Sequence, residues 1–315
     1  MDQETERENR TRALVDAFAA IREGDLSQTW LARFSDLPRD GAKTFRREWA
    51  MLPETLRVDV VRRFDTLSEE HVELNFGRAL RVALDDPSPV VRQLAIAGLW
   101  EDESGELLAR LRGILRDDPS PDVRSEAASA LGRFSQRASV ETLPDEATSG
   151  LRDDLVRATQ SSSSSYAEQR RALESLGPFG VEPEVSAAIQ EAFESGDHGL
   201  QCSAVRAMGL SRESRWLPMI LSELQSEEPE LRFEAARSAG LMGSTDALPL
   251  LLDAARDDDP EVRHTAINAI AQIGGRGAAR ALERLAEDAS EADLELIDAA
   301  LEEVGTLLEP FEQSS

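Results

Sequence analysis

Apolar residues recur along most of this chain with the spacing of amphipathic helices. Between residues 246 and 273 the first apolar stripe consists of Ala247, Leu248, Leu251, Leu252 and Ala255, and the second of Val262, Ala266, Ile270 and Ile273. An Asp-rich turn separates the two stripes, and a Gly-Gly pair follows the second. Alternating runs of Val, Ile and Thr, which would indicate strands, do not occur. The pattern predicts two antiparallel helices joined by a short turn.

This two-helix pattern repeats along the chain every 31–35 residues. DPSPVVRQLAIAGLW begins at Asp86 and DPSPDVRSEAASALG at Asp118, while EPELRFEAARSAG begins at Glu228 and DPEVRHTAINAIA at Asp259. A helix pair of this size cannot bury its own apolar stripe, so neighbouring pairs must stack. We therefore predict an all-α fold, an α-solenoid (superhelix) of about eight stacked antiparallel helix pairs.

Proline marks the start of the second helix in several units. It stands two residues before a Val-Arg or Leu-Arg pair in four of them, at Pro89, Pro121, Pro229 and Pro260. The first helical position suits proline because its missing N–H has no partner to lose there. Ser88, Ser120 and Asp259 directly precede three of these prolines, and we expect their side chains to cap the exposed amides.

The chain divides by pattern into two parts. Residues 1–36 predict two short amphipathic helices, which we interpret as an N-terminal helical cap on the stack; a mobile arm that docks a partner is the alternative. Residues 37–315 form the repeat solenoid, with an irregular, longer unit at about 133–177. We expect the extra length, and the weakest joint, at the serine run Ser161–Ser165.

The repeat resembles the HEAT repeat family, specifically the short class related to the repeats of phycobilin lyases. The resemblance rests on the Asp-Pro turns and on the pairs Val91-Arg92, Val123-Arg124, Leu231-Arg232 and Val262-Arg263, and it covers about residues 40–308. The segment Phe64–Glu103 is also similar to bacterial HEAT-repeat proteins of unassigned function. The resemblance implies an α-solenoid but leaves function open, because this fold hosts scaffolds, adaptors and a few enzymes.

Charge excludes two classes of partner. The chain has 35 Lys+Arg against 61 Asp+Glu, a formal net charge of −26, and Lys43 is its one lysine. Nucleic acids and anionic membranes require a surface that neutralises phosphates, so we expect neither as a partner. The acidity fits either a basic partner or solvation in a salt-rich environment, and the even scatter of acids along the chain favours solvation.

The sequence also predicts the cellular compartment and the oligomeric state. The start, MDQETERENR, has no apolar segment typical of a secretory signal, and no run approaches 18 apolar residues. We expect a cytoplasmic protein, a monomer rather than an oligomer.

Four arginines recur one step after the apolar anchor of a second helix: Arg92, Arg124, Arg232 and Arg263. They could grip a polyanion or an acidic peptide. Alternatively they form a structural ladder, each pairing with a carboxylate of the adjacent turn, such as Asp118 or Asp257. The arginines and the aspartates recur equally often along the repeats, which favours the structural ladder.

Residues capable of catalysis or metal binding are few. His71, His198 and His264 are each isolated in sequence, whereas a zinc or di-iron centre needs several converging ligands. Cys202 lies four residues after His198, a spacing compatible with a nucleophile and base, but a small buried hydrophobe is the default interpretation of a lone cysteine. We therefore expect no catalytic residues, no metal and no cofactor.

Partner binding is the remaining function. We expect a non-enzymatic scaffold or adaptor that holds a protein or peptide on the concave face of the solenoid; a lyase-like or chaperone role on a tetrapyrrole–protein adduct is the alternative, by analogy with phycobilin lyases. By helical register the binding wall consists of Gln93, Ile96, Trp100, Ser125, Ser129, Phe233, Arg237, His264 and Asn268. An exposed Trp100 would be a binding hot spot, whereas a buried one would fill a gap between repeats.

Overall fold

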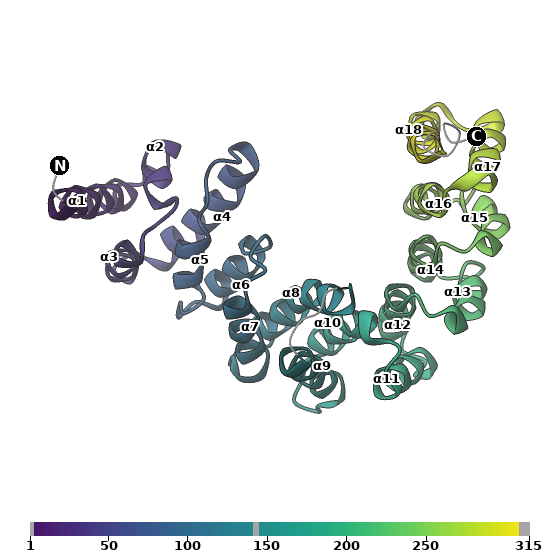
Figure 1. Ribbon diagram of the computed structural model, residues 1–315, viewed down its shortest axis with the longest axis horizontal. Coiled ribbons are helices and arrows are strands. Elements are labelled where there is room, and N and C mark those ends of the chain that lie inside the picture. The colour runs from purple at the N-terminus through teal and green to yellow at the C-terminus, as the bar shows by residue number, and fades with distance from the viewer. Residues whose placement is uncertain (1–2, 141–144, 309–315) are drawn as a thin grey trace. The chain divides into compact units, whose positions relative to one another are not determined.

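The computed structural model describes residues 3–140 and 145–308, and these residues contain helices and no strands (Figure 1). The chain forms two compact units, residues 1–134 and 135–315, with the boundary inside helix α8. The predicted all-α solenoid architecture is confirmed: the described residues contain eight consecutive helix pairs, α3/α4 to α17/α18.

The first unit begins with two N-terminal helices and continues with the first pairs. Its elements are α1 (Gln3–Arg22), α2 (Gln28–Leu31), the short 3-10 helix η1 (Ala32–Phe34), α3 (Arg39–Trp49), α4 (Glu54–Glu70), α5 (Gly77–Ala83), α6 (Pro89–Gly98), α7 (Gly105–Asp117) and α8 (Pro121–Val140). The N-terminal helices pack through aromatic side chains. The rings of Phe18 and Phe34 lie 4.8 Å apart, and both contact Phe45 of α3.

The second unit consists of two layers of helices. Its elements are α9 (Asp145–Gln160), α10 (Tyr166–Leu176), η2 (Gly177–Phe179), α11 (Pro183–Glu194), α12 (His198–Ser211), η3 (Ser214–Trp216), α13 (Leu217–Glu223), α14 (Pro229–Met242), η4 (Thr245–Ala247), α15 (Leu248–Ala254), α16 (Pro260–Ile273), α17 (Gly275–Asp288) and α18 (Glu291–Leu308). The second helices of the pairs, α10, α12, α14, α16 and α18, lie side by side, and we call them the even layer (Figure 1).

The predicted helix starts are correct, and one of the predicted caps is replaced by another contact. Helices α6, α8, α14 and α16 all begin at their proline. The Asp259 side chain accepts hydrogen bonds from the backbone N–H groups of Glu261 and Val262, as expected for a cap. Ser88 does not cap α6; its hydroxyl donates instead to Glu54 Oε1 at 2.6 Å. The serine is therefore used to join two repeats.

The irregular unit takes up its extra length differently from our expectation. Helix α8 has 20 residues, whereas α12, α14 and α16 have 14 each, so part of the extra length extends a helix. The serine run is an ordinary connection between α9 and α10. Ser165 forms a capping box with Glu168, and Gln169 Nε2 donates to the Ser161 carbonyl at 3.3 Å. The extra length therefore does not lie in the serine run alone, and the expectation that the weakest joint lies at Ser161–Ser165 stays a prediction.

Arginine–aspartate pairs connect successive repeats. The Arg92 guanidinium donates from Nε and Nη2 to both carboxylate oxygens of Asp118, at 2.8 and 2.7 Å. Arg232 forms the same fork on Asp257, at 2.6 and 2.9 Å. Each aspartate also accepts the backbone N–H of the residue two positions later, at 2.9 Å, and so orders the turn before the next second helix. Each aspartate carboxylate thus orders its own turn and also binds the arginine of the preceding repeat.

The four predicted ladder arginines share a second contact. Each donates from Nη1 to a carbonyl of its own turn: Arg92 to Asp86, Arg124 to Asp118, Arg232 to Ser226 and Arg263 to Asp257. Arg57, which does not belong to the four predicted ladder arginines, forms an equivalent ion pair with Asp86 at 2.9 Å. Arg263 lies 3.6 Å from Asp293, without the two-pronged geometry.

Glutamine replaces the ladder arginine in two helices. Gln169 in α10 and Gln201 in α12 occupy the register of Arg232 in α14. The Gln201 amide donates to the Phe193 carbonyl at 3.2 Å, so it contacts the end of α11 in its own repeat. A neutral amide cannot form the charged fork to the following repeat.

Small residues bring the even-layer helices close together. A Cβ atom added to Gly209 of α12 would lie 2.5 Å from Cβ and 2.7 Å from Cα of Ser238 in α14. One added to Gly240 of α14 would lie 2.9 Å from Cα of Ala269 in α16. Ser238 uses the approach to donate a hydrogen bond to the Val205 carbonyl at 2.9 Å. Gly209 and Gly240 are therefore contact points between helices of the even layer.

We expect Gly209→Ala to lower the free energy of unfolding by about 1–3 kcal/mol, because the new methyl group overlaps the backbone of α14. Gly113→Ala in α7 is the matched control: nothing lies within 4 Å of its added Cβ. The control should raise stability by about 0.5–1 kcal/mol through helix propensity alone. Urea unfolding of both variants measures the difference, and equal effects of the two substitutions would contradict the close packing.

Candidate functional site

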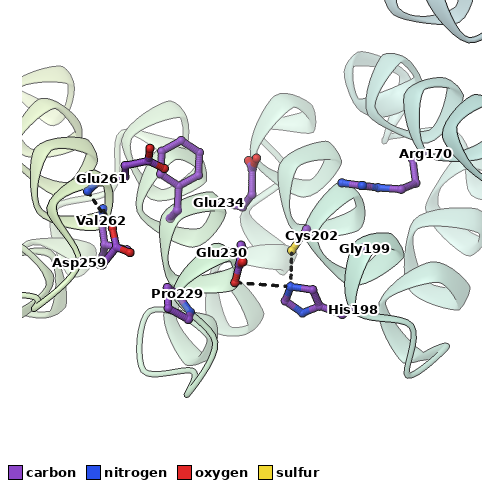
Figure 2. A pocket seen from close by; sticks show the side chains of 11 residues that line it. Arg170, His198, Gly199, Cys202, Pro229, Glu230, Glu234, Asp259, Glu261 and Val262 are labelled. Carbon is purple, nitrogen blue, oxygen red and sulfur yellow. Dashed lines mark hydrogen bonds and ion pairs between the residues drawn. The ribbon is translucent and has the colours of Figure 1, made fainter.

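A groove of about 430 Å³ lies across the even layer of the second unit (Figure 2). Helices α10, α12, α14 and α16 contribute to its walls. Six side chains give the groove its chemical character: Arg170, His198, Cys202, Glu230, Phe233 and Glu234. The repeat explains the assembly, since Arg170, Cys202 and Phe233 hold the same register in three successive second helices.

Glu234 is the most unusual group in the groove. Its Oε2 atom is buried and has no hydrogen-bond partner among the described residues. Burial raises the pKa of Glu234, while the positive charges of Arg206 and Arg237 act in the opposite direction. Figure 2 shows the Arg170 side chain extending from α10 toward Glu234. Because a buried oxygen without a donor costs free energy, this carboxylate is suited to accept a hydrogen bond from a ligand.

A second carboxylate nearby, that of Glu174, is fully engaged. It accepts hydrogen bonds from Ser203 Oγ at 2.9 Å and from Arg171 Nη1 at 3.0 Å, and Arg206 Nε lies 3.7 Å away. Ser203 in turn accepts from Arg170 Nε at 3.0 Å. The buried charge of Glu174 therefore holds α10 and α12 in register and is not available to a partner.

Tyr166, the first residue of α10, links this helix to the start of α12. Its hydroxyl donates to Asp197, and this bond raises the pKa of Tyr166 and lowers that of Asp197. Asp197 also caps α12 by accepting the Leu200 N–H at 2.9 Å. A Cβ on Gly199 would overlap the Tyr166 hydroxyl, so glycine is required for this approach.

His198 and Cys202 lie at the start of α12. Cys202 Sγ is 3.9 Å from His198 Nε2, which lies 3.7 Å from Glu230 Oε2 (Figure 2). Burial, with the negative charges of Glu234 and Glu230, raises the pKa of Cys202 to about 11. Little thiolate exists at neutral pH, so the pair is poorly suited to nucleophilic catalysis.

The histidines, although isolated in sequence, are not all isolated in space. One ligand atom each of His198, Glu228 and Glu230 lie within 4.8 Å of one another. The acids come from the next repeat, so spacing within one helix could not reveal them. His264 contacts Asp293, with Nε2 3.2 Å from Oδ1.

Of the four predicted wall residues in the second unit, Phe233 alone belongs to the lining of the groove. Phe233 is half-buried and lines it, while Arg237, His264 and Asn268 are exposed beside the same layer.

In the first unit, one residue that we predicted to lie on the binding wall lies in the core instead. Ser129 is exposed and Gln93 and Ser125 are half-buried, but Ile96 is only 1% exposed and belongs to the core. The repeat register places Ala97, which is exposed, in the position equivalent to Ser129. The error was a shift by one residue.

Trp100 and Trp216 differ in their exposure to solvent. Trp100 is 62% exposed, so it fills no gap between repeats; it borders a separate cavity of about 440 Å³ in the first unit, together with Arg81 and Asp102. Trp216 is 4% exposed and is part of the core.

Comparison with known proteins identifies the repeat. HEAT repeats match residues 78–162 and 217–302, together more than half of the chain. The chain belongs to the HEAT repeat family. Within the described residues, no helix of this HEAT repeat protein is both long enough and apolar enough to cross a membrane. No curated protein shows significant similarity to its sequence.

Solved structures share the fold at low sequence identity. A chain of the CpcE–CpcF complex of phycocyanin lyase from Nostoc sp. PCC7120 is 17% identical, with a TM-score of 0.52 over 85% of this chain and 96% of that one. A chain of the complex of Kap95p with RanGDP is 12% identical, with a TM-score of 0.53 over 89% of this chain and 43% of that one. These likenesses show the HEAT repeat architecture alone.

We expect Glu234→Gln to raise the thermal midpoint at neutral pH, because it removes a buried charge. The raised pKa of Glu234 means that the ionised form costs stability above the folded pKa, and that this cost disappears as pH falls toward the unfolded value of about 4.3. The difference between variant and wild type should therefore shrink on acidification from pH 8 to pH 4.5. A variant that is less stable than wild type at pH 8 would contradict this account.

Proposed function

We propose that this HEAT repeat protein is a non-enzymatic interaction module that holds a protein or peptide partner on the even layer of residues 145–308. The unpartnered Glu234 oxygen inside a groove carries the proposal. A partner can supply the missing donor, whereas burial of this oxygen without one only costs free energy.

The chemistry of the groove indicates a basic segment of the partner. Glu230, Glu234 and Glu261 contribute carboxylates, and Phe233 contributes an aromatic ring. A guanidinium or ammonium group is attracted both by carboxylates and by an aromatic face. An arginine or lysine side chain of the partner therefore fits this groove, and the net charge of −26 would attract such a segment at long range.

Two properties support a binding role without catalysis. The Cys202 thiol, with its pKa raised to about 11, is largely protonated at neutral pH. HEAT repeats present extended surfaces that are suited to protein partners. The alternative, a lyase-like or chaperone role on a tetrapyrrole–protein adduct, is supported only by the fold shared with phycocyanin lyase. The compartment and the oligomeric state remain predictions.

A random peptide display library selected on the full chain tests the proposal. We expect the selected peptides to share an arginine or lysine and to bind the Phe233→Ala/Glu234→Gln variant at least tenfold more weakly, because one buried anchor contributes about 2 kcal/mol. Fluorescence anisotropy of the labelled peptides measures the affinities. Asp298→Asn, an exposed acid on α18 outside the groove, is the control and should bind as wild type.

Two outcomes of this selection would contradict the proposal. In the first, the selected peptides lack basic residues. In the second, they bind the groove variant and wild type equally well. Circular dichroism establishes that both variants keep the helical fold.

A further inference from the structure

Imidazole nitrogen and carboxylate oxygens meet where α12 and α14 begin, and the Cys202 sulfur lies beside the imidazole. His198 Nε2 lies 3.7 Å from Glu230 Oε2 and 3.9 Å from Cys202 Sγ. A carboxylate oxygen of Glu228 completes a set in which the His198, Glu228 and Glu230 atoms all lie within 4.8 Å of one another. Figure 2 shows the Cys202, His198 and Glu230 side chains pointing toward one another between Arg170 and Asp259.

The helices position these donors in two pairs. His198 and Cys202 are one turn apart on α12, so their side chains project from the same face. Glu228 is the residue that precedes α14 and Glu230 lies in its first turn, on either side of Pro229. Packing of α12 against α14 brings the two pairs together. The contact thus joins consecutive repeats.

The donor types indicate the class of ion. Imidazole nitrogen and thiolate sulfur favour zinc-class transition metals, whereas calcium and magnesium prefer oxygen ligands alone. From the usual bond lengths, a tetrahedral zinc ion separates its nitrogen and sulfur ligands by about 3.5 Å and its nitrogen and oxygen ligands by about 3.3 Å. The observed separations of 3.9 and 3.7 Å are only a few tenths of an ångström longer. Small rotations of the exposed His198 and Glu230 side chains can close this difference.

We propose that His198, Cys202, Glu228 and Glu230 bind a divalent ion of the zinc class and that the ion clips α12 to α14. The ion would be coordinated by one nitrogen, one sulfur and carboxylate oxygens, and the Cys202 thiol would release its proton to solvent when the ion binds. Glu230 belongs both to the donor set and to the groove of the proposed function, but the metal proposal does not rest on that function, because it uses neither Phe233 nor Glu234.

Cobalt(II) is the probe that reports the ligands directly, because a bound thiolate gives a charge-transfer absorption. Full-length protein freed of metal with EDTA is titrated with Co²⁺ and then with Zn²⁺ in competition. We expect one Co²⁺ per chain, a thiolate-to-cobalt band in the near ultraviolet, and displacement of the cobalt by zinc. The band should disappear in Cys202→Ser, which keeps nearly the same volume.

The variants that remove single donors complete the test. His198→Ala should weaken Zn²⁺ binding at least tenfold, and Glu228→Gln/Glu230→Gln should weaken it similarly. His264→Ala is the matched control, since that exposed histidine pairs with Asp293 on the next repeat and should leave zinc affinity unchanged. Circular dichroism checks that each variant is folded.

The proposal is overturned if Co²⁺ gives no charge-transfer band. It is equally overturned if His198→Ala binds Zn²⁺ as tightly as His264→Ala, or if the double glutamine variant binds as tightly as wild type.

Discussion

The fork between an arginine of one repeat and an aspartate of the next is the interaction on which this fold depends most. The side chains of Arg92 and Asp118 are 10% and 7% exposed, so the pair is largely withdrawn from water. A charge withdrawn from water is tolerated only when its hydrogen bonds are complete. Here the guanidinium also binds its own turn and the carboxylate also binds the following turn. Completing these bonds sets the position of one repeat relative to the next.

The groove forms where this ladder is interrupted. In α10 and α12, Gln169 and Gln201 replace the arginines, so no charged fork leaves these helices at that register. Close contacts of small residues, such as Gly209 against Ser238, hold the even layer together instead. The charged groups on this stretch, Glu234 among them, face a groove of about 430 Å³. The groove therefore extends from two helices that lack the ladder arginine to α14, which keeps its fork from Arg232 to Asp257.

Local signals in the sequence were enough to predict the helices and their order, because the prolines, the repeat period and the apolar stripes act within a few residues. The errors arose from the register within a helix or from contacts with a neighbouring repeat. Ile96 was placed on the surface through a one-residue shift, and Ser88 bonds to Glu54 of the preceding repeat instead of capping its helix. The approach of His198 to Glu228 and Glu230 depends on the packing distance between two helices, which no spacing within one helix encodes.

Hydrogen exchange of Arg232→Gln, read by mass spectrometry, tests the central role of the fork most directly. This variant gives α14 the same residue that α10 and α12 carry naturally at the equivalent position. If the fork holds neighbouring repeats together, exchange will become faster in residues 229–273 and remain unchanged in residues 39–117. Unchanged exchange in residues 229–273, or an equal increase along the whole chain, would contradict the account.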